Sequence, residues 1–220
     1  MIERQKETLS LWLGVLLAGA LWVVVFLWRP GNFWLLLGGA TLLLAFYRWC
    51  WNCQPWQIKQ WPVAEVGIGL AAAALLYVIF MVGNVVSALF SLWLPQPLAH
   101  WFAPAAVAAV YAFGAGSSPW LVGILLFGIT SPCEEWFWRG FLQKRLSTRL
   151  GLWRGWLIAA FCYAAVHFAT GNLLLVAAAW VAGLFFGGLV LWRGNLVAAT
   201  LAHSLWTLTV FILWPIPPLM

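Results

Sequence analysis

Runs of about 20 apolar residues recur along this chain, and they restrict its fold more than any other feature. A helix of that length covers about 30 Å, which is the thickness of the hydrocarbon core of a membrane. Hydrocarbon offers the backbone no hydrogen-bond partner, so the crossing segments are expected to be helices. The sequence therefore predicts an all-α fold, a polytopic bundle of transmembrane helices.

The composition agrees with this fold class. Of the 220 residues, 65% are hydrophobic and only 7% are charged, against roughly a quarter of charged residues in soluble domains. The 19 tryptophans fit as well, because tryptophan favours the membrane-water interface. The net charge of +6 follows from topology, as described below, so the expected partner is the lipid bilayer and not a nucleic acid.

About seven crossings account for the apolar runs, within one integral membrane domain that covers residues 1–220. A polar, tryptophan-rich segment at 50–62 is expected at the interface. The residues at 105–113 are expected to form a short re-entrant or interfacial helix, with an eighth crossing as the alternative. The run at 63–94 is too long for a straight crossing, so it is expected to tilt or to break near Gly83 and Asn84. The predicted spans are residues 9–28, 33–49, 63–94, 120–142, 155–168, 173–192 and 196–214.

The basic residues indicate how these spans are oriented. Cytoplasmic loops of membrane proteins are rich in Lys and Arg. With seven crossings and a cytoplasmic N-terminus, the opposite side carries only Arg29, whereas an eighth crossing at 105–113 would spoil the asymmetry. The sequence thus favours seven spans, and the small size of the protein favours a bacterial inner membrane. The basic residues on the predicted cytoplasmic side are Arg4, Lys6, Arg48, Lys59, Lys144, Arg145, Arg149, Arg154 and Arg193.

Two adjacent carboxylates stand inside the fourth predicted span. Glu134 and Glu135 are two of the five acidic residues of the chain, and Arg139 follows one turn after Glu135. An ionised carboxylate in hydrocarbon costs from about 3 kcal/mol upward, so such a pair is expected to serve a function. The i,i+4 spacing predicts an ion pair in which Arg139 keeps Glu135 charged and fixed. Glu134 is then left to take up a proton.

Two histidines on later spans complete this polar group. His167 lies in the fifth span and His203 in the seventh, and their predicted depths place both near Glu134. A glutamate in a cavity of low dielectric constant can act as a general base toward water. A histidine can pass a proton to a leaving amine or donate to the oxyanion that forms when water attacks a carbonyl. Together these are parts for amide hydrolysis.

Tyr163 and Thr207 stand one helical turn from the two histidines, on the same helical faces. Tyr163 is expected either to orient the imidazole of His167 or simply to pack against it. Thr207 is expected either to donate a hydrogen bond to the oxyanion or to bond back to the carbonyl of His203.

These residues resemble the motifs of the CAAX-protease and bacteriocin-processing family of intramembrane proteases (CPBP, also called ABI). That family shows E-E-x-x-x-R, then F-x-x-x-H, then H-x-x-x-N on successive helices. The first motif is complete at residues 134–139. The second occurs at 163–167 with Tyr in place of Phe, and the third at 203–207 with Thr in place of Asn. The resemblance covers roughly residues 120–213.

The resemblance implies a glutamate-dependent endopeptidase whose catalytic helices lie within residues 120–214. In this interpretation Glu134 and His167 activate water, while His203 and position 207 support the oxyanion. No cofactor is expected; if a divalent metal such as zinc binds instead, Glu134, His167 and His203 would be its ligands. The expected substrate is a membrane-anchored peptide or a C-terminal protein tail.

Two other functions would use the same buried residues. A proton-coupled transporter also needs Glu and His within the membrane, although the chain shows no convincing internal repeat. A catalytically inactive member of the family would be a membrane scaffold, an alternative suggested by the threonine at 207.

Overall fold

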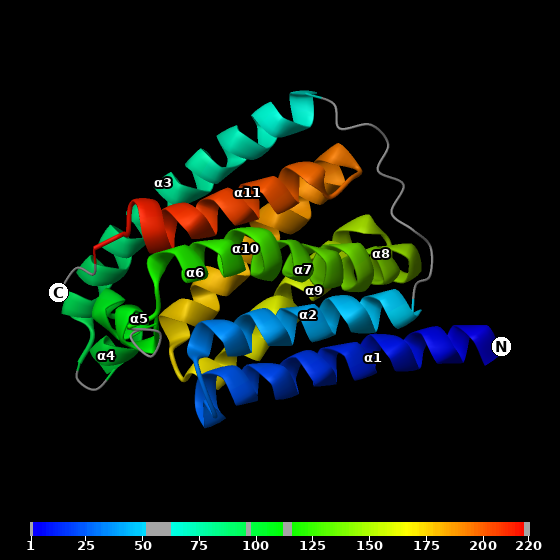
Figure 1. The fold of residues 1–220 in the computed structure, drawn as a ribbon, viewed down its shortest axis with the longest axis horizontal. Coiled ribbons are helices and arrows are strands. Elements are labelled where there is room, and N and C mark those ends of the chain that lie inside the picture. The colour runs from blue at the N-terminus through cyan, green and yellow to red at the C-terminus, as the bar shows by residue number, and fades with distance from the viewer. Residues whose placement is uncertain (1, 52–62, 96–97, 112–115, 218–220) are drawn as a thin grey trace.

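The computed structural model describes residues 2–51, 63–95, 98–111 and 116–217, and these residues form a bundle of helices without any strand (Figure 1). The predicted all-α fold class is therefore confirmed. The interfacial segment expected at 50–62 lies outside the described residues from position 52 onward.

Most of the helical elements join end to end into longer runs. The η elements are π-helical turns, apart from the 3-10 turn η5, and each continues the helix before it. In chain order the described elements are α1 (Ile2–Val23), η1 (Val24–Trp28), α2 (Phe33–Trp51), α3 (Val63–Trp93), α4 (Leu98–Phe102), α5 (Pro104–Tyr111), α6 (Pro119–Leu125), η3 (Leu126–Thr130), α7 (Ser131–Phe137), η4 (Trp138–Gln143), α8 (Lys144–Leu150), α9 (Leu152–Val166), η5 (His167–Thr170), α10 (Leu173–Arg193), α11 (Val197–Leu208) and η6 (Thr209–Leu213).

Several of these runs are suited to a membrane. By length and composition, five helices of the described residues could cross one, and the run Val197–Leu213 is a shorter apolar helix. The run from α6 to α8 occupies the place of the fourth predicted span and carries its charged residues. The five helices are Gln5–Trp28, Phe33–Trp51, Val63–Trp93, Leu152–Thr170 and Leu173–Arg193.

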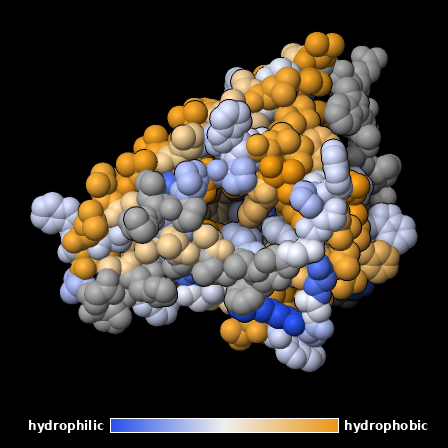
Figure 2. Space-filling model, turned by 60° about the vertical axis from the view of Figure 1, so that its left-hand side comes forward, coloured by the Kyte–Doolittle hydropathy of each residue, from blue (hydrophilic) through white to orange (hydrophobic). Residues whose placement is uncertain are grey.

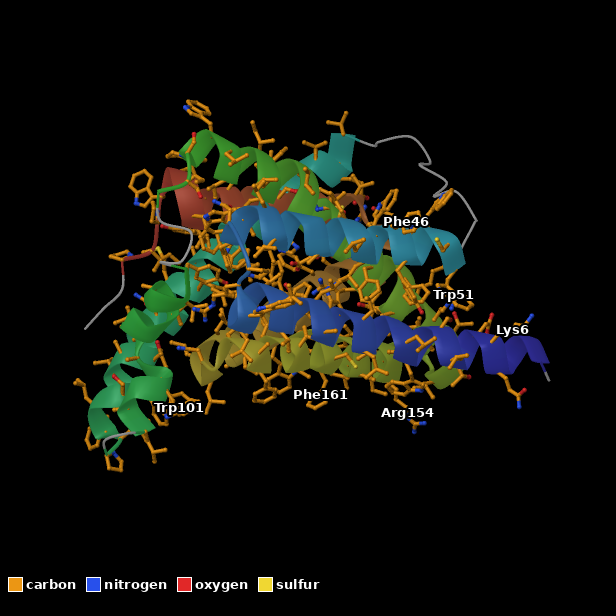
Figure 3. All side chains as sticks on the ribbon, turned by 60° about the horizontal axis from the view of Figure 1, so that its bottom comes forward. Lys6, Phe46, Trp51, Trp101, Arg154 and Phe161 are labelled. Carbon is orange, nitrogen blue, oxygen red and sulfur yellow. The ribbon has the colours of Figure 1, made fainter. Side chains whose placement is uncertain are left out.

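Large apolar side chains cover the flanks of the bundle. Phe46 on α2 and Phe161 on α9 point outward and are 57% and 65% exposed (Figure 3). Soluble monomers rarely expose apolar surface on this scale, whereas hydrocarbon solvates it. This surface, together with the long apolar helices, identifies an integral membrane protein.

Two of the alternatives left open by the sequence are resolved. α3 is one continuous helix of 31 residues, so the break expected near Gly83 and Asn84 is wrong. α3 is about 46 Å long, which exceeds the thickness of the hydrocarbon core. A crossing in which α3 is tilted from the membrane normal therefore remains the prediction. α5 has 8 residues and covers only about 12 Å, so the described part of the segment at 105–113 is a short helix that cannot cross the membrane by itself.

The basic side chains gather at the end of the bundle where α1 begins. There Arg149 of α8 forms an ion pair with Glu7 of α1 at 2.9 Å, and Arg193 of α10 forms one with Glu65 of α3 at 2.6 Å. Lys6 and Arg154 lie toward the same end (Figure 3). Arg29, by contrast, follows η1 at the opposite end. We call the end of the bundle where α1 begins the basic end. Its described basic side chains are Lys6, Arg48, Lys144, Arg145, Arg149, Arg154 and Arg193.

The fourth helical run passes through the middle of the bundle and thereby positions the site. α7 packs against α2 on one side and α11 on the other, and α9 packs against α10. Gly183 of α10 lies so close to Ala160 of α9 that a Cβ atom on the glycine would be 3.2 Å from the Cα of Ala160. Such small residues let membrane helices approach closely. The side chains of α7 can therefore reach α9 and α11, and Arg139 of η4 reaches α10.

Candidate active site

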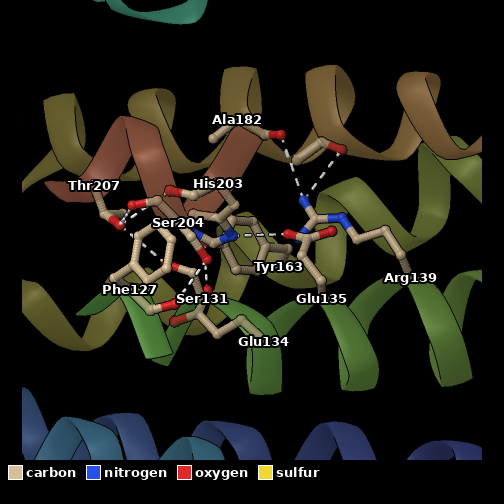
Figure 4. A network of polar contacts seen from close by, with 11 residues as sticks. Phe127, Ser131, Glu134, Glu135, Arg139, Tyr163, Ala182, His203, Ser204 and Thr207 are labelled. Carbon is tan, nitrogen blue, oxygen red and sulfur yellow. Dashed lines mark hydrogen bonds and ion pairs between the residues drawn. The ribbon is translucent and has the colours of Figure 1, made fainter. Parts of the chain in front are cut away.

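Glu134 is held by a tyrosine from a neighbouring helix. It lies on α7 and is 5% exposed, and the hydroxyl of Tyr163 on α9 donates a hydrogen bond of 2.8 Å to its Oε2 (Figure 4). Tyr163 was expected to orient or to pack against His167. Its ring does lie edge-on to the imidazole at 5.0 Å, but its hydroxyl holds the carboxylate instead. Tyr163 therefore links the first and second motifs.

His167 has a partner on each ring nitrogen. Its Nδ1 lies 2.8 Å from the backbone carbonyl of Tyr163, and the indole N–H of Trp22 on α1 points to its Nε2 at 3.3 Å. An indole can only donate, so Nε2 accepts and Nδ1 carries the proton, which makes the imidazole neutral in this arrangement. His167 and Glu134 make no hydrogen bond with each other. Each is instead bonded to Tyr163, through the carbonyl and the hydroxyl respectively.

Glu135 stands at the centre of a charged group behind the site. The predicted ion pair with Arg139 is present at 2.8 Å, and the same oxygen, Oε1, lies 2.8 Å from Nδ1 of His203 (Figure 4). Glu135 is fully buried. The guanidinium of Arg139 also lies 4.7 Å above the ring of Tyr163, a cation–π contact. This network fixes the positions of all three charged or titratable groups.

His203 is thereby oriented from behind. Because Glu135 accepts from Nδ1, the other nitrogen, Nε2, is the one available for chemistry, and it makes no hydrogen bond with a described residue. The ring stacks on Phe186 at a centroid distance of 4.5 Å. A carboxylate–histidine pair of this kind fixes both the tautomer and the direction of the imidazole.

Thr207 adopts the second of its two expected arrangements. Its hydroxyl lies 3.0 Å from the carbonyl of His203 and 3.1 Å from that of Ser204. The hydroxyl of Ser131 on α7 is also 3.0 Å away. A hydroxyl has a single hydrogen, so when Thr207 donates to a carbonyl, Ser131 donates to Thr207.

Five of the seven motif residues meet at one cavity of about 830 Å³. Of the described residues that line it, Glu134 is the one with a carboxylate; Glu135 and Arg139 lie outside the lining. The two adjacent glutamates therefore occupy different environments, one at the cavity and one behind it. The motif residues that line the cavity are Glu134, Tyr163, His167, His203 and Thr207.

The residues considered as zinc ligands do not form a metal site. Among the described residues, no three His, Cys, Asp or Glu side chains lie close enough together to hold a metal ion. Glu134 is bonded to Tyr163, and both nitrogens of His167 have protein partners. The donor set named from the sequence thus does not fit a metal in this arrangement.

Two residues that contact the site were not identified from the sequence. Trp22 belongs to the first span, and one tryptophan among 19 gives no signal of its own. Ser131 could have been found, because it lies one turn before Glu135 on the same helix and is a polar residue in an apolar span.

Comparison with known proteins agrees with these motifs. Residues 115–209 match the family model described as "Type II CAAX prenyl endopeptidase Rce1-like". The match confirms the resemblance to CAAX-type proteases, and at its coarsest it supports an intramembrane endopeptidase. No curated protein and no solved structure matches the chain. The matched segment contains all the motif residues, namely Glu134, Glu135, Arg139, Tyr163, His167, His203 and Thr207.

Proposed function

From this family match we propose that the chain is a glutamic-type intramembrane endopeptidase, which hydrolyses a peptide bond in a membrane-anchored peptide or a C-terminal protein tail. One observation carries the proposal. Glu134 of α7 and His203 of α11 line the same cavity, and each is held by another side chain, Glu134 by Tyr163 and His203 by Glu135. A base and an imidazole fixed around one cavity are the parts that amide hydrolysis needs.

Glu134 acts as the general base. Tyr163 occupies its Oε2, which leaves Oε1 to accept a proton from a water molecule in the cavity. The oxygen of that water forms a bond to the carbonyl carbon of the scissile peptide, and the carbonyl electron pair moves onto its oxygen. When the C–N bond breaks, Glu134 returns the proton to the leaving amine, so the carboxylate is regenerated.

His203 stabilises the oxyanion. In its protonated form it donates from Nε2 to the oxyanion, while Nδ1 donates to the Glu135 carboxylate. The Glu135 carboxylate, which is paired with Arg139, balances the charge of the imidazolium. The network behind the cavity thus acts on the reaction through His203.

His167 and Thr207 complete the proposed set, and each must exchange one partner to act. His167 must release the indole of Trp22 before its Nε2 can help Glu134 to position water. Thr207 must turn its hydroxyl away from the backbone carbonyls to donate to the oxyanion. Both exchanges would accompany substrate binding.

The proposal includes a location. The concentration of basic side chains at one end favours a cytoplasmic N-terminus, and we place the protein in a bacterial inner membrane as a single membrane domain. The helices from residue 120 to 214 are its catalytic part.

The test uses purified protein in detergent with apolar fluorogenic peptides. Glu134→Gln should lower the cleavage rate by about 10²–10⁴-fold, the usual contribution of a general base. Glu7→Gln, on the basic end, is the matched control and should cleave like the wild type. Unchanged cleavage by Glu134→Gln would refute the mechanism. No cleavage by the wild type, together with a Glu134-dependent proton flux in liposomes, would favour the transporter.

A further inference from the structure

The cavity that contains Glu134 opens toward one end of the bundle. Lining residues that are themselves partly or fully exposed lie at the ends of helices: Gly116 and Ser117 precede α6, and Pro215 follows η6. Figure 2 brings that end forward and shows a hollow on it. These helix ends lie opposite the basic end, which holds the start of α1 and the whole of α8 (Figure 1).

The charges of the two ends differ sharply. Seven described basic side chains lie at the basic end, and Arg29 is the one described basic residue at the end where the cavity opens. Basic residues accumulate on the cytoplasmic side of membrane proteins. The opening of the cavity therefore faces away from the cytoplasm.

The residues that line the cavity favour a substrate segment without charged side chains. Apart from Glu134 and the two imidazoles, the described lining residues are uncharged, and aromatic rings such as Phe80, Tyr111 and Trp206 are prominent. A charged side chain brought into this cavity would lose its water and find no countercharge beyond the catalytic groups. The cavity volume of about 830 Å³ lies within the range of roughly 300–1,000 Å³ that is typical of ligand-binding pockets.

We propose that the substrate is a polypeptide tail on the non-cytoplasmic side of the membrane, whose uncharged, apolar segment enters the cavity from that side. This inference rests on the proposed endopeptidase function and specifies its substrate. A membrane-anchored protein whose tail has already been translocated presents an apolar segment on the non-cytoplasmic side, as the proposal requires. Its anchor keeps the tail at the membrane surface, where the opening lies.

The side of the opening is tested by labelling cysteines. In a cysteine-free background, Ser117→Cys places a thiol at the rim and Thr148→Cys places one on α8 at the basic end. A membrane-impermeant maleimide should label Ser117→Cys in right-side-out spheroplasts and lose that labelling in inside-out vesicles. Thr148→Cys should give the reverse pattern. Labelling of Ser117→Cys from the cytoplasmic side alone would overturn the proposed side of access.

The chemistry of the segment is tested with a peptide series in detergent. A single Lys or Asp beside the cleaved bond should lower kcat/KM by roughly 100-fold, in line with the penalty for a charge in an apolar environment. The same residue at the far end of the peptide is the matched control and should have little effect. Ala178→Asp, in the cavity wall, should restore cleavage of the Lys peptide. Equal cleavage of neutral and charged peptides would overturn the inference about the substrate.

These outcomes separate the inference from the proposed function. Cleavage that depends on Glu134, combined with the wrong labelling pattern, would leave the endopeptidase intact and reject only the side of access. The expected labelling without any Glu134-dependent cleavage would instead reject the endopeptidase.

Discussion

Glu134 and Glu135 are consecutive residues with opposite surroundings. Neighbours in a helix point roughly 100° apart, so one carboxylate can face the cavity while the other faces the interior of the bundle. Glu135 accepts from Arg139 and His203, whereas Glu134 receives its hydrogen bond from Tyr163. The more weakly held carboxylate is the one at the cavity. This difference supports the proposed roles of Glu134 in proton transfer and of Glu135 in positioning.

The first prediction at this scale concerns Tyr163→Phe. The variant loses one hydrogen bond to the Glu134 carboxylate, and bonds to charged groups contribute about 1.5–3 kcal/mol. We expect kcat to fall by roughly 10- to 100-fold with little change in KM. Tyr47→Phe is the matched control, because its hydroxyl donates to the backbone carbonyl of Ser10, away from the cavity. A wild-type kcat for Tyr163→Phe would show that the tyrosine does not position the base.

The second prediction concerns Arg139→Met. It leaves the Glu135 carboxylate buried without its arginine, which typically costs about 3–5 kcal/mol of folding free energy. We expect a clear fall in the melting temperature in detergent, and the double variant with Glu135→Gln should recover part of it. The control Arg149→Met breaks an ion pair at the surface and should cost only about 0–1 kcal/mol. Equal losses in the two single variants would contradict the role of Arg139.

Contacts within one helix could be predicted from the sequence, and contacts between helices only in part. The Arg139–Glu135 pair follows from the helical repeat alone. Depth along the span brought His167 and His203 to the level of Glu134, but depth does not give the direction in which a side chain points. For this reason the sequence did not identify Tyr163 as the direct partner of Glu134, and it did not identify Trp22 as the partner of His167.

At the scale of the element, the fourth helical run is longer and less regular than its predicted span. The sequence placed the span at 120–142 and put Lys144, Arg145 and Arg149 on the cytoplasmic side. The helix instead continues to Leu150, since long basic side chains can extend from a helix end toward water. Two π-helical turns, η3 and η4, flank α7 within this run. Such turns often occur at functional sites, because they change which face of the helix points inward.

The third prediction concerns the tight connection between α8 and α9. Gly151, with a φ of +88°, turns the chain, and Gly155 then packs directly on α8. A Cβ atom at Gly155 would overlap the backbone of Ser147. Gly155→Ala should therefore lower the melting temperature strongly and reduce the yield of folded protein. Gly39→Ala, where a Cβ would meet nothing within 4 Å, is the matched control. Equal yields and melting temperatures would contradict this packing.

At the scale of the whole molecule, α3 is fastened to the bundle at its start and again along its middle. At the basic end, Glu65 accepts three hydrogen bonds from Arg193, and these join the start of α3 to the end of α10. Farther along, Tyr77 donates to the carbonyl of Trp214, and Asn84 donates to that of Pro217. The sequence did not reveal this ion pair, because its two residues are 128 positions apart. Between these attachments α3 forms part of the cavity wall.

The fourth prediction is that Glu65→Gln loosens α3. The variant removes the charge from a buried side chain that holds Arg193, so the melting temperature should fall. Glu7→Gln changes an ion pair whose carboxylate is half exposed and should have a smaller effect. Differential scanning fluorimetry in detergent compares the two variants. A larger loss for Glu7→Gln would contradict the proposed fastening.

The bonds from Tyr77 and Asn84 hold the backbone of residues 214–217 beside the opening of the cavity. A reporter or affinity tag fused to the C-terminus, three residues after Pro217, would thus start close to the place where substrate is proposed to enter, and would compete with it. A tag fused before α1 starts at the far end of the bundle (Figure 1). Kinetic work on this protein should therefore use N-terminal tags, and a comparison of the two tagged forms would itself report on access to Glu134.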